Sequence, residues 1–223
     1  MKLTDELIEK SNGMISLHDE INDWTGKHYK MFDDGGVELE TGEFLYGMVR
    51  VLKPNLILET GTYTGISAMY MAQGLKDNGA MGKLISLEID QSHKSRAEKL
   101  WHLTGLAAYA YCNLRSSEDF AISEQYDFMF LDSEPILRFS ELVRFYPFLK
   151  PGGFVFLHDL HRHMGQGQPK NPDHPEMSNW PWGDLPKEIK FWVQTDALRP
   201  IHFPTPRGLM GFYKPTEDDY KWK

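Results

Sequence analysis

Two glutamates that each close an apolar run are the first residues whose placement suggests chemistry. Glu59 ends the run "LILE", a turn with glycines at positions 61 and 65 follows, and Glu88 ends the later run "KLISLE". Glycine lets a turn pass close to a ligand, and the N–H groups at the start of the next helix attract an anion. Glu59 would repel a pyrophosphate but suit an ammonium or sulfonium group. Glu88 is placed to accept both hydroxyls of an unphosphorylated ribose, although a strand-end glutamate can also be merely solvated.

The spacing of the glycines separates two classes of nucleotide site. The turn reads G-x-x-x-G, whereas the dinucleotide fingerprint requires G-x-G-x-x-G. The missing glycine and the acidic Glu59 both speak against a nucleotide-binding oxidoreductase. The pattern predicts a site for a positively charged nucleoside.

A second group of polar residues follows two later apolar runs. Asp132 and Asp159 each stand directly after such a run, so both carboxylates are expected to face the same cleft. His161, His163 and His174 come next along the chain. Histidine titrates near neutrality and suits general base work, and His161 is the best placed because it lies two residues beyond Asp159. These histidines could equally be solvated polar residues of a loop.

The elements that must position these residues alternate along the chain. Near-continuous apolar strands that alternate with amphipathic helices indicate a parallel sheet covered by helices on both faces. The candidate strands are 56–60, 83–88, 108–112, 126–131 and 153–158. The candidate helices are 42–52, 65–75, 92–103, 117–123 and 137–149.

The C-terminal third departs from this alternation. Residues 201–203 and 209–213 read as two strands joined by a short turn, which predicts antiparallel pairing. The segment 160–186 is rich in Pro, Gly, His and Trp and is too long for an ordinary connection. Trp180 and Trp182 favour a lid-like insertion, in which they either wall an acceptor pocket or pack the lid onto the domain.

The composition of the whole chain narrows the class of protein. The 223 residues suit one domain, and 41% hydrophobic with 25% charged residues is enough for a core. The net charge of −8 makes nucleic acid a poor partner. Cys112 is the single cysteine, which excludes an intramolecular disulfide. With no apolar leader and no membrane-length run, we expect a cytoplasmic protein with no membrane partner.

The ordered set of motifs resembles the class I S-adenosylmethionine-dependent methyltransferases, and most closely their small-molecule O-methyltransferase branch of the catechol and caffeoyl-CoA type. The resemblance rests on "TGEFLYGMVRVLKPNLILETGTYTGISA", "LISLEID", "YDFMFLD", "LKPGGFVFLHD" and "RGLMGFYK", in order and at family spacing. It implies one methyltransferase domain over residues 1–223. The expected fold is a Rossmann-like, doubly wound α/β sheet of seven mostly parallel strands with a reversed C-terminal strand. Residues 1–40 would form an N-terminal helical cover.

The resemblance assigns the methionine end of S-adenosylmethionine to the turn after the first strand. Glu59 and Gly61 would lie beside its amino acid portion. Tyr63 and Ser67 would hold its carboxylate, and Gly65 would give the backbone room.

The nucleoside end is assigned by the same resemblance. Glu88 would bind the ribose and Ile89 would flank the adenine. Val37 would border the pocket from the N-terminal segment. Adenine contacts are expected just after the third strand, at Arg115 and Ser116, in a stretch that matches the family poorly.

At the reaction centre the resemblance implies a divalent cation, usually magnesium, held by Asp132 and Asp159, with Asp132 also bordering the cofactor. His158 would be a third ligand or a supporting group, although magnesium disfavours imidazole. The sequence departs from the family where Leu160 replaces an asparagine ligand and Pro135 replaces a lysine. The two aspartates could instead orient the substrate or cap helix ends without a metal.

The function that follows is methyl transfer from S-adenosylmethionine to a hydroxyl of a small molecule such as a phenol, a sugar or a natural product. Asp132, Asp159 and His161 are the expected catalytic residues, with a divalent metal assisting. Metal-independent O- or N-methylation is the nearest alternative, and a non-catalytic cofactor-binding module is a more distant one. A homodimer is a family-level expectation only.

Overall fold

The first apolar runs form a parallel sheet whose strand ends carry the candidate residues. In the computed structural model, β3 (Leu56–Thr60), β4 (Lys83–Glu88) and β5 (Ala110–Leu114) lie in the order β5-β4-β3. Leu56 of β3 pairs with Lys83, and Leu84 of β4 pairs with Ala110. The structure describes residues 2–22, 26–32, 36–79, 82–159, 186–203 and 205–221. The chain divides into two compact units, Met1–Ala121 and Ile122–Lys223.

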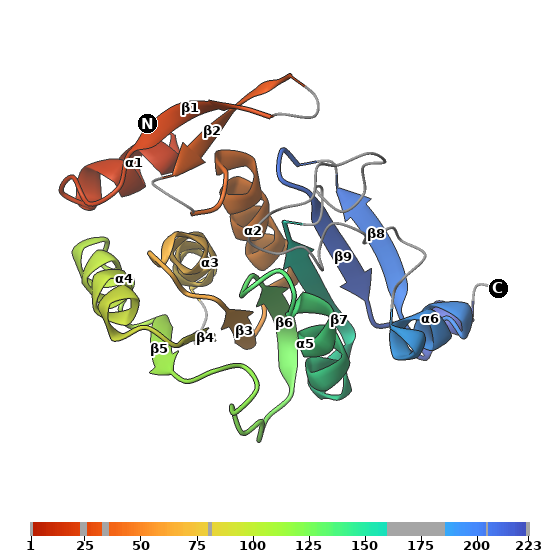
Figure 1. Cartoon of the computed structure of the whole chain (residues 1–223). Coiled ribbons are helices and arrows are strands. Elements are labelled where there is room, and N and C mark those ends of the chain that lie inside the picture. Colours follow the sequence, from red (N-terminus) through yellow and green to blue (C-terminus); the bar gives the residue numbers. More distant parts are fainter. Residues whose placement is uncertain are drawn as a thin grey trace. The chain divides into compact units, whose positions relative to one another are not determined.

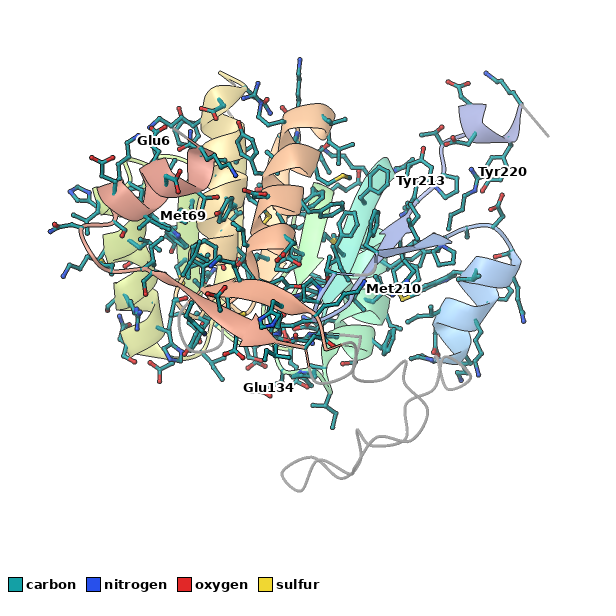
Figure 2. The ribbon with its side chains drawn as sticks, turned by 90° about the horizontal axis from the view of Figure 1, so that it is seen from above. Glu6, Met69, Glu134, Met210, Tyr213 and Tyr220 are labelled. Atoms are coloured by element: carbon teal, nitrogen blue, oxygen red, sulfur yellow. The ribbon has the colours of Figure 1, made fainter. Side chains whose placement is uncertain are left out.

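Three helices alternate with these strands along the chain. They are α2 (Leu39–Leu52), α3 (Ile66–Asp77) and α4 (Gln91–Leu103). Ten consecutive residues of α3, from Ile66 to Leu75, are buried, and Met69, labelled in Figure 2, is one of them. Asp90 caps α4 by accepting hydrogen bonds from the backbone N–H groups of Ser92 and His93. This cap, two residues beyond Glu88, fixes the start of α4 at Gln91.

The N-terminal segment is only partly the helical cover that the sequence predicts. Helix α1 (Leu3–Lys10) is followed by an antiparallel pair, β1 (Leu17–Ile21) and β2 (His28–Phe32) (Figure 1). The expectation of helix is wrong for these two strands. The stretch between them includes Gly26 at a φ of 65°, which favours a turn between strands over a continuous helix.

The second unit holds the other four strands of the sheet. They are β6 (Tyr126–Leu131), β7 (Leu149–His158), β8 (Arg199–Phe203) and β9 (Leu209–Tyr213), in the order β6-β7-β9-β8. β6 and β7 are parallel, and β9 runs antiparallel to both β7 and β8. The helices are α5 (Arg138–Phe145) and α6 (Lys187–Gln194), with short 3₁₀ helices η1 (Tyr146–Phe148) and η5 (Asp218–Tyr220). Tyr213 at the end of β9, labelled in Figure 2, donates a hydrogen bond of 2.6 Å to Asp219 of η5.

The reversed strand β9 lies inside the sheet, and β8 forms its edge. Four of the five residues of β9 are buried, whereas β8 is largely exposed. Pro200 of β8 has no N–H to donate to a neighbouring strand, so an edge position suits it. The seven-stranded, mostly parallel sheet with one reversed strand and flanking helices confirms the predicted Rossmann-like α/β class.

Several predicted boundaries differ from the structure. Residues 117–119 form a turn and residues 120–123 have no regular secondary structure where a helix is expected, because seven residues cannot offset the cost of helix nucleation without packing. The helix expected over 137–149 ends at Phe145, since Pro147 cannot continue it, and a 3₁₀ turn leads straight into β7. β5 begins two residues later than predicted. Among the described residues, no helix has the length and apolar character needed to cross a bilayer.

Candidate active site

The turn between β3 and α3 is held in a conformation that only certain residues adopt easily. Gly61, Tyr63 and Gly65 have φ values of 80°, 46° and 81°. A non-glycine residue at positive φ is strained, so the fold around Tyr63 must hold it there. The N–H groups of Gly61 and Thr62 both donate to the carbonyl of Leu87, at 3.0 and 3.1 Å, which ties the turn to β4.

Gly65 is required by packing as well as by conformation. A Cβ at this position would lie 2.7 Å from the Cβ of Ala97 and 2.9 Å from Nε1 of Trp101. The indole of Trp101 donates a 2.8 Å hydrogen bond to the carbonyl of Gly65. Gly65 therefore allows α3 and α4 to approach closely. No side chain caps the N-terminus of α3, so its first N–H groups stay open to an anion.

Glu59 is completely buried in a network of hydroxyl groups. Its carboxylate accepts hydrogen bonds from Ser67, at 2.5 Å, and from Ser86. Thr62 lies 2.5 Å from Ser86 and 3.5 Å from the thiol sulfur of Cys112. The hydroxyl proton of Ser67 thus points to Glu59 and is not directed at a ligand. The network joins β3, the turn, β4 and α3, which positions the turn.

Glu88 is fixed at the end of β4 by three backbone N–H groups. One carboxylate oxygen accepts from Tyr63 at 2.7 Å, and the other accepts from Ile89 at 2.9 Å and Asp90 at 3.0 Å. A carboxylate offers about four acceptor positions, so these bonds leave about one for a ribose hydroxyl. The side chain of Ile89 beside it is 74% exposed, which leaves an apolar surface for a planar ring.

His93 belongs to this site, although it is not among the residues predicted from the sequence. Its Nδ1 lies 3.7 Å from a carboxylate oxygen of Glu88, and its ring meets the ring of Tyr63 edge-on with centroids 4.7 Å apart. The signal that identifies it is the Asp90 cap, which places His93 in the first turn of α4.

The remaining cofactor residues of the first unit are placed as follows. Val37 is buried between β2 and α2, and its carbonyl accepts from the N–H of Phe32 at 3.4 Å. Leu114 of β5 pairs with Glu88 of β4, so Arg115 and Ser116 follow at the same end of the sheet. The hydroxyl of Ser116 accepts from the N–H of Glu118 at 3.1 Å. A role in binding adenine stays a prediction for both residues.

The second unit brings Asp132, His158 and Asp159 together at the ends of β6 and β7. Atoms of the three side chains that could bind a metal lie within 4.8 Å of one another. Nδ1 of His158 is 3.1 and 3.2 Å from the two oxygens of Asp132 and 3.8 Å from Oδ1 of Asp159. His158 is fully buried, and Asp159 has a φ of 60°.

Two arginines that the sequence did not single out complete this cluster. Nη2 of Arg138, at the start of α5, donates to Oδ1 of Asp132 at 2.8 Å and to Oδ2 of Asp159 at 3.3 Å. Nη2 of Arg207, in the turn between β8 and β9, donates to the same oxygen of Asp159 at 2.5 Å. Burial acts to raise the pKa of Asp159, but His158, Arg207 and Arg138 together hold that pKa well below its ordinary value. We call Asp132, Arg138, His158, Asp159 and Arg207 the charged cluster.

The donor set of the charged cluster does not fit a divalent metal ion. Magnesium needs free carboxylate oxygens at close range, yet Oδ1 of Asp132 and Oδ2 of Asp159 are both occupied by guanidinium N–H groups. Two unit positive charges 4 Å apart repel by about 4 kcal/mol near a protein surface, and a divalent ion would face more. The buried polar atoms without partners here, among the described residues, are Nε and Nη1 of Arg138. These atoms are donors, which cannot bind a cation.

Several predicted residues lie outside the described residues. They are Leu160, His161, His163, His174, Trp180 and Trp182. The predicted lid of residues 160–186 lies outside them too, except for Pro186.

Part of the chain is similar to known methyltransferases. Residues 58–160 match a methyltransferase domain. A protein of Mycobacterium sp. (strain JLS), named as a presumed O-methyltransferase, is 23% identical over 128 residues, which cover 56% of this chain and 57% of that protein. A catechol O-methyltransferase of Niastella koreensis is 31% identical over 101 residues, covering 42% of this chain and 43% of that protein. The chain thus aligns with little more than half of the first relative.

The fold comparison extends over nearly the whole chain. The crystal structure of the S-adenosylhomocysteine-bound Podospora anserina methyltransferase PaMTH1 superposes with a TM-score of 0.71 at 16% identity, covering 95% of this chain and 88% of that one. At this identity the likeness shows the fold alone.

Proposed function

We propose that the chain is a class I methyltransferase that transfers a methyl group from S-adenosylmethionine to a hydroxyl oxygen of a small molecule. The sheet topology and the methyltransferase domain matched over residues 58–160 support this proposal. The observation that carries the proposal is the environment of Glu88. A buried carboxylate, held by the backbone of the β3–α3 turn and beside an exposed isoleucine, suits a nucleoside with a free ribose.

In this proposal the first unit binds the cofactor. Glu88 accepts a ribose hydroxyl, and Ile89 and His93 border the base and the sugar. The open N–H groups at the start of α3 take the carboxylate of the methionine portion, next to Tyr63. Glu59 and Ser67 act on the cofactor through the shape of the turn, and Gly61 and Gly65 keep the backbone close. Val37, Arg115 and Ser116 are retained as border residues.

The reaction needs little covalent chemistry from the protein. The acceptor oxygen attacks the methyl carbon, the carbon–sulfur bond breaks, and its electron pair neutralises the sulfonium to give S-adenosylhomocysteine. The hydroxyl proton leaves to a base, for which His161 remains the proposed residue. Asp132 and Asp159 are proposed to orient the acceptor, since the ionised state of Asp159 is favoured.

We assign no step to a divalent metal, because guanidinium N–H groups already hold one oxygen of each aspartate and place positive charge between them. The acceptor hydroxyl is then activated only by its position relative to the methyl carbon and by the base that takes its proton. The proposed acceptor is a phenol, sugar or natural product, and we retain a cytoplasmic location and an association into dimers as proposals. The net charge of −8 disfavours nucleic acid as a partner.

Two measurements test the proposal. Thermal unfolding with S-adenosylhomocysteine or NAD separates the methyltransferase from an oxidoreductase, since only the first ligand should stabilise the protein. Incubation with methyl-labelled S-adenosylmethionine and a panel of phenols, sugars and amines should then label an oxygen. Stabilisation by NAD alone, or label found only on amines, would contradict the proposal as stated.

A further inference from the structure

We propose that Arg138 is a built-in cation: its guanidinium group occupies the place between Asp132 and Asp159 that a divalent metal ion would need, and it excludes such an ion from the charged cluster. The two carboxylates follow neighbouring parallel strands, so their separation is set by the sheet. Nη2 of Arg138 contacts both of them, at 2.8 and 3.3 Å.

The position of Arg138 is fixed by its surroundings. Its side chain is 2% exposed, and the same Nη2 also donates to the carbonyl of Ser133 at 2.9 Å. Residues 138–145 form α5, and Arg138 is its first residue, directly after the loop that carries Asp132 and Ser133. The guanidinium group therefore cannot swing into solvent to make room for an ion.

Charge balance within the cluster supports the same assignment. Arg138 and Arg207 together carry two positive charges beside the two negative charges of Asp132 and Asp159, and His158 also lies against both carboxylates. A divalent ion added to this set would leave an excess of positive charge in a largely buried place. The unpartnered Nε and Nη1 atoms of Arg138 add two further donors, which can bind an oxygen atom but not a cation.

Arg138 is accordingly a positioning residue, which holds the two carboxylates in one arrangement. The consequence for catalysis rests on the proposed function: methyl transfer should proceed in the presence of EDTA. Metal binding itself does not depend on that function and can be measured without turnover.

The test uses Mn²⁺ as the probe and the electron paramagnetic resonance signal of free Mn²⁺ as the readout. Wild-type protein should leave the signal unchanged up to about 1 mM ion, the weak limit of protein sites for divalent ions. Arg138→Met removes the charge but keeps an unbranched apolar side chain, and it should bind Mn²⁺ at least about tenfold more tightly than wild type. Arg138→Lys keeps the positive charge and, like wild type, should leave the signal of free Mn²⁺ unchanged.

A second substitution tests whether the Mn²⁺ bound by the Arg138→Met protein lies at the charged cluster. Adding Asp132→Asn to Arg138→Met should abolish the gained binding, because a carboxylate ligand is lost. Wild-type binding that Asp132→Asn abolishes would overturn the proposal, as would a folded Arg138→Met protein with no gain. Calorimetric titration of S-adenosylhomocysteine into the same samples reports separately on the cofactor site, so failure of the metal prediction and failure of the proposed function are distinguishable.

Arg138 is buried, so its replacement by methionine can prevent folding. Circular dichroism identifies that outcome, and Arg138→Gln then takes its place, since glutamine removes the charge but keeps a polar side chain that can donate to Asp132. The glutamine variant should again gain Mn²⁺ binding. A folded Arg138→Gln protein that binds no Mn²⁺ would count against exclusion by charge.

Discussion

The hydroxyl of Ser67 donates to the carboxylate of Glu59 across 2.5 Å, with Glu59 fully buried and Ser67 nearly so. The first residue of this pair stands in α3 and the second in β3, so the bond spans the glycine turn from one side to the other. A buried carboxylate without donors would be costly. Ser67 and Ser86, which both donate hydrogen bonds to Glu59, therefore hold the turn in its conformation before any ligand binds.

Replacing Ser86 by alanine should destabilise the protein by about 2 kcal/mol, because it removes a donor from buried Glu59 and a partner from Thr62. Urea unfolding measures this change in the free energy of unfolding. Ser95→Ala is the control, since Ser95 lies on α4 with hydrogen bonds that are exposed. Equal midpoints for the two variants would show that the network adds nothing to stability.

Gly65→Ala should be more damaging than alanine at another glycine of positive φ. Gly65 and Gly79 have φ values of 81° and 62°, and a Cβ at Gly79 would meet nothing within 4 Å. Gly79→Ala should therefore lower the free energy of unfolding only by the strain of an alanine at positive φ, about 1 to 2 kcal/mol. Gly65→Ala adds contacts of 2.7 and 2.9 Å with Ala97 and Trp101, so we expect at least about 1 kcal/mol more. Thermal or urea unfolding of both variants compares the two costs.

Glu88→Gln should weaken the binding of S-adenosylhomocysteine by about 10- to 100-fold, the value of one or two hydrogen bonds to a charged group. The amide keeps the shape of the side chain but replaces one acceptor oxygen by a donor, which would oppose the N–H of Tyr63 or of Ile89. Isothermal titration calorimetry gives the affinity directly. Glu98→Gln on the exposed side of α4 is the matched control and should bind like wild type.

The sheet could be predicted closely because each strand carries its own local signal. Apolar runs bounded by turn residues correctly predicted the ends of β3, β4, β6 and β9. The position of Glu88 at the carboxyl end of a parallel strand followed from the same pattern. Boundaries were missed where packing or proline decided them, as at Pro147.

The charged cluster could not be predicted in the same way. Arg207 lies 48 residues beyond Asp159, and nothing in the local sequence around either residue indicates that they pair. Arg138 looks like an ordinary residue of an amphipathic helix, and its burial appears only when α5 is packed. Similarly, Ser67 sits at the expected position, but its hydroxyl donates, together with that of Ser86, to the buried carboxylate of Glu59. Which buried charges pair depends on the tertiary structure, and such pairs leave no periodic pattern in the sequence.

The stability of the protein should depend on the ionisation of Asp159 at acid pH. His158, Arg207 and Arg138 hold its pKa in the folded state below the ordinary value of about 3.9, despite the opposing effect of burial. A lowered pKa means that the unfolded chain binds the proton more readily, so the contribution is fully present above that ordinary value and is lost as pH falls below it. Asp159→Asn should thus cost about 3 kcal/mol at pH 7, since it leaves two arginines short of a carboxylate. The gap between wild type and variant, measured by urea unfolding at steps from pH 7 to pH 3, should stay level down to about pH 5 and then narrow. A gap that widened on acidification would mean that Asp159 is protonated in the native state, and the charge balance proposed for the cluster would then be wrong.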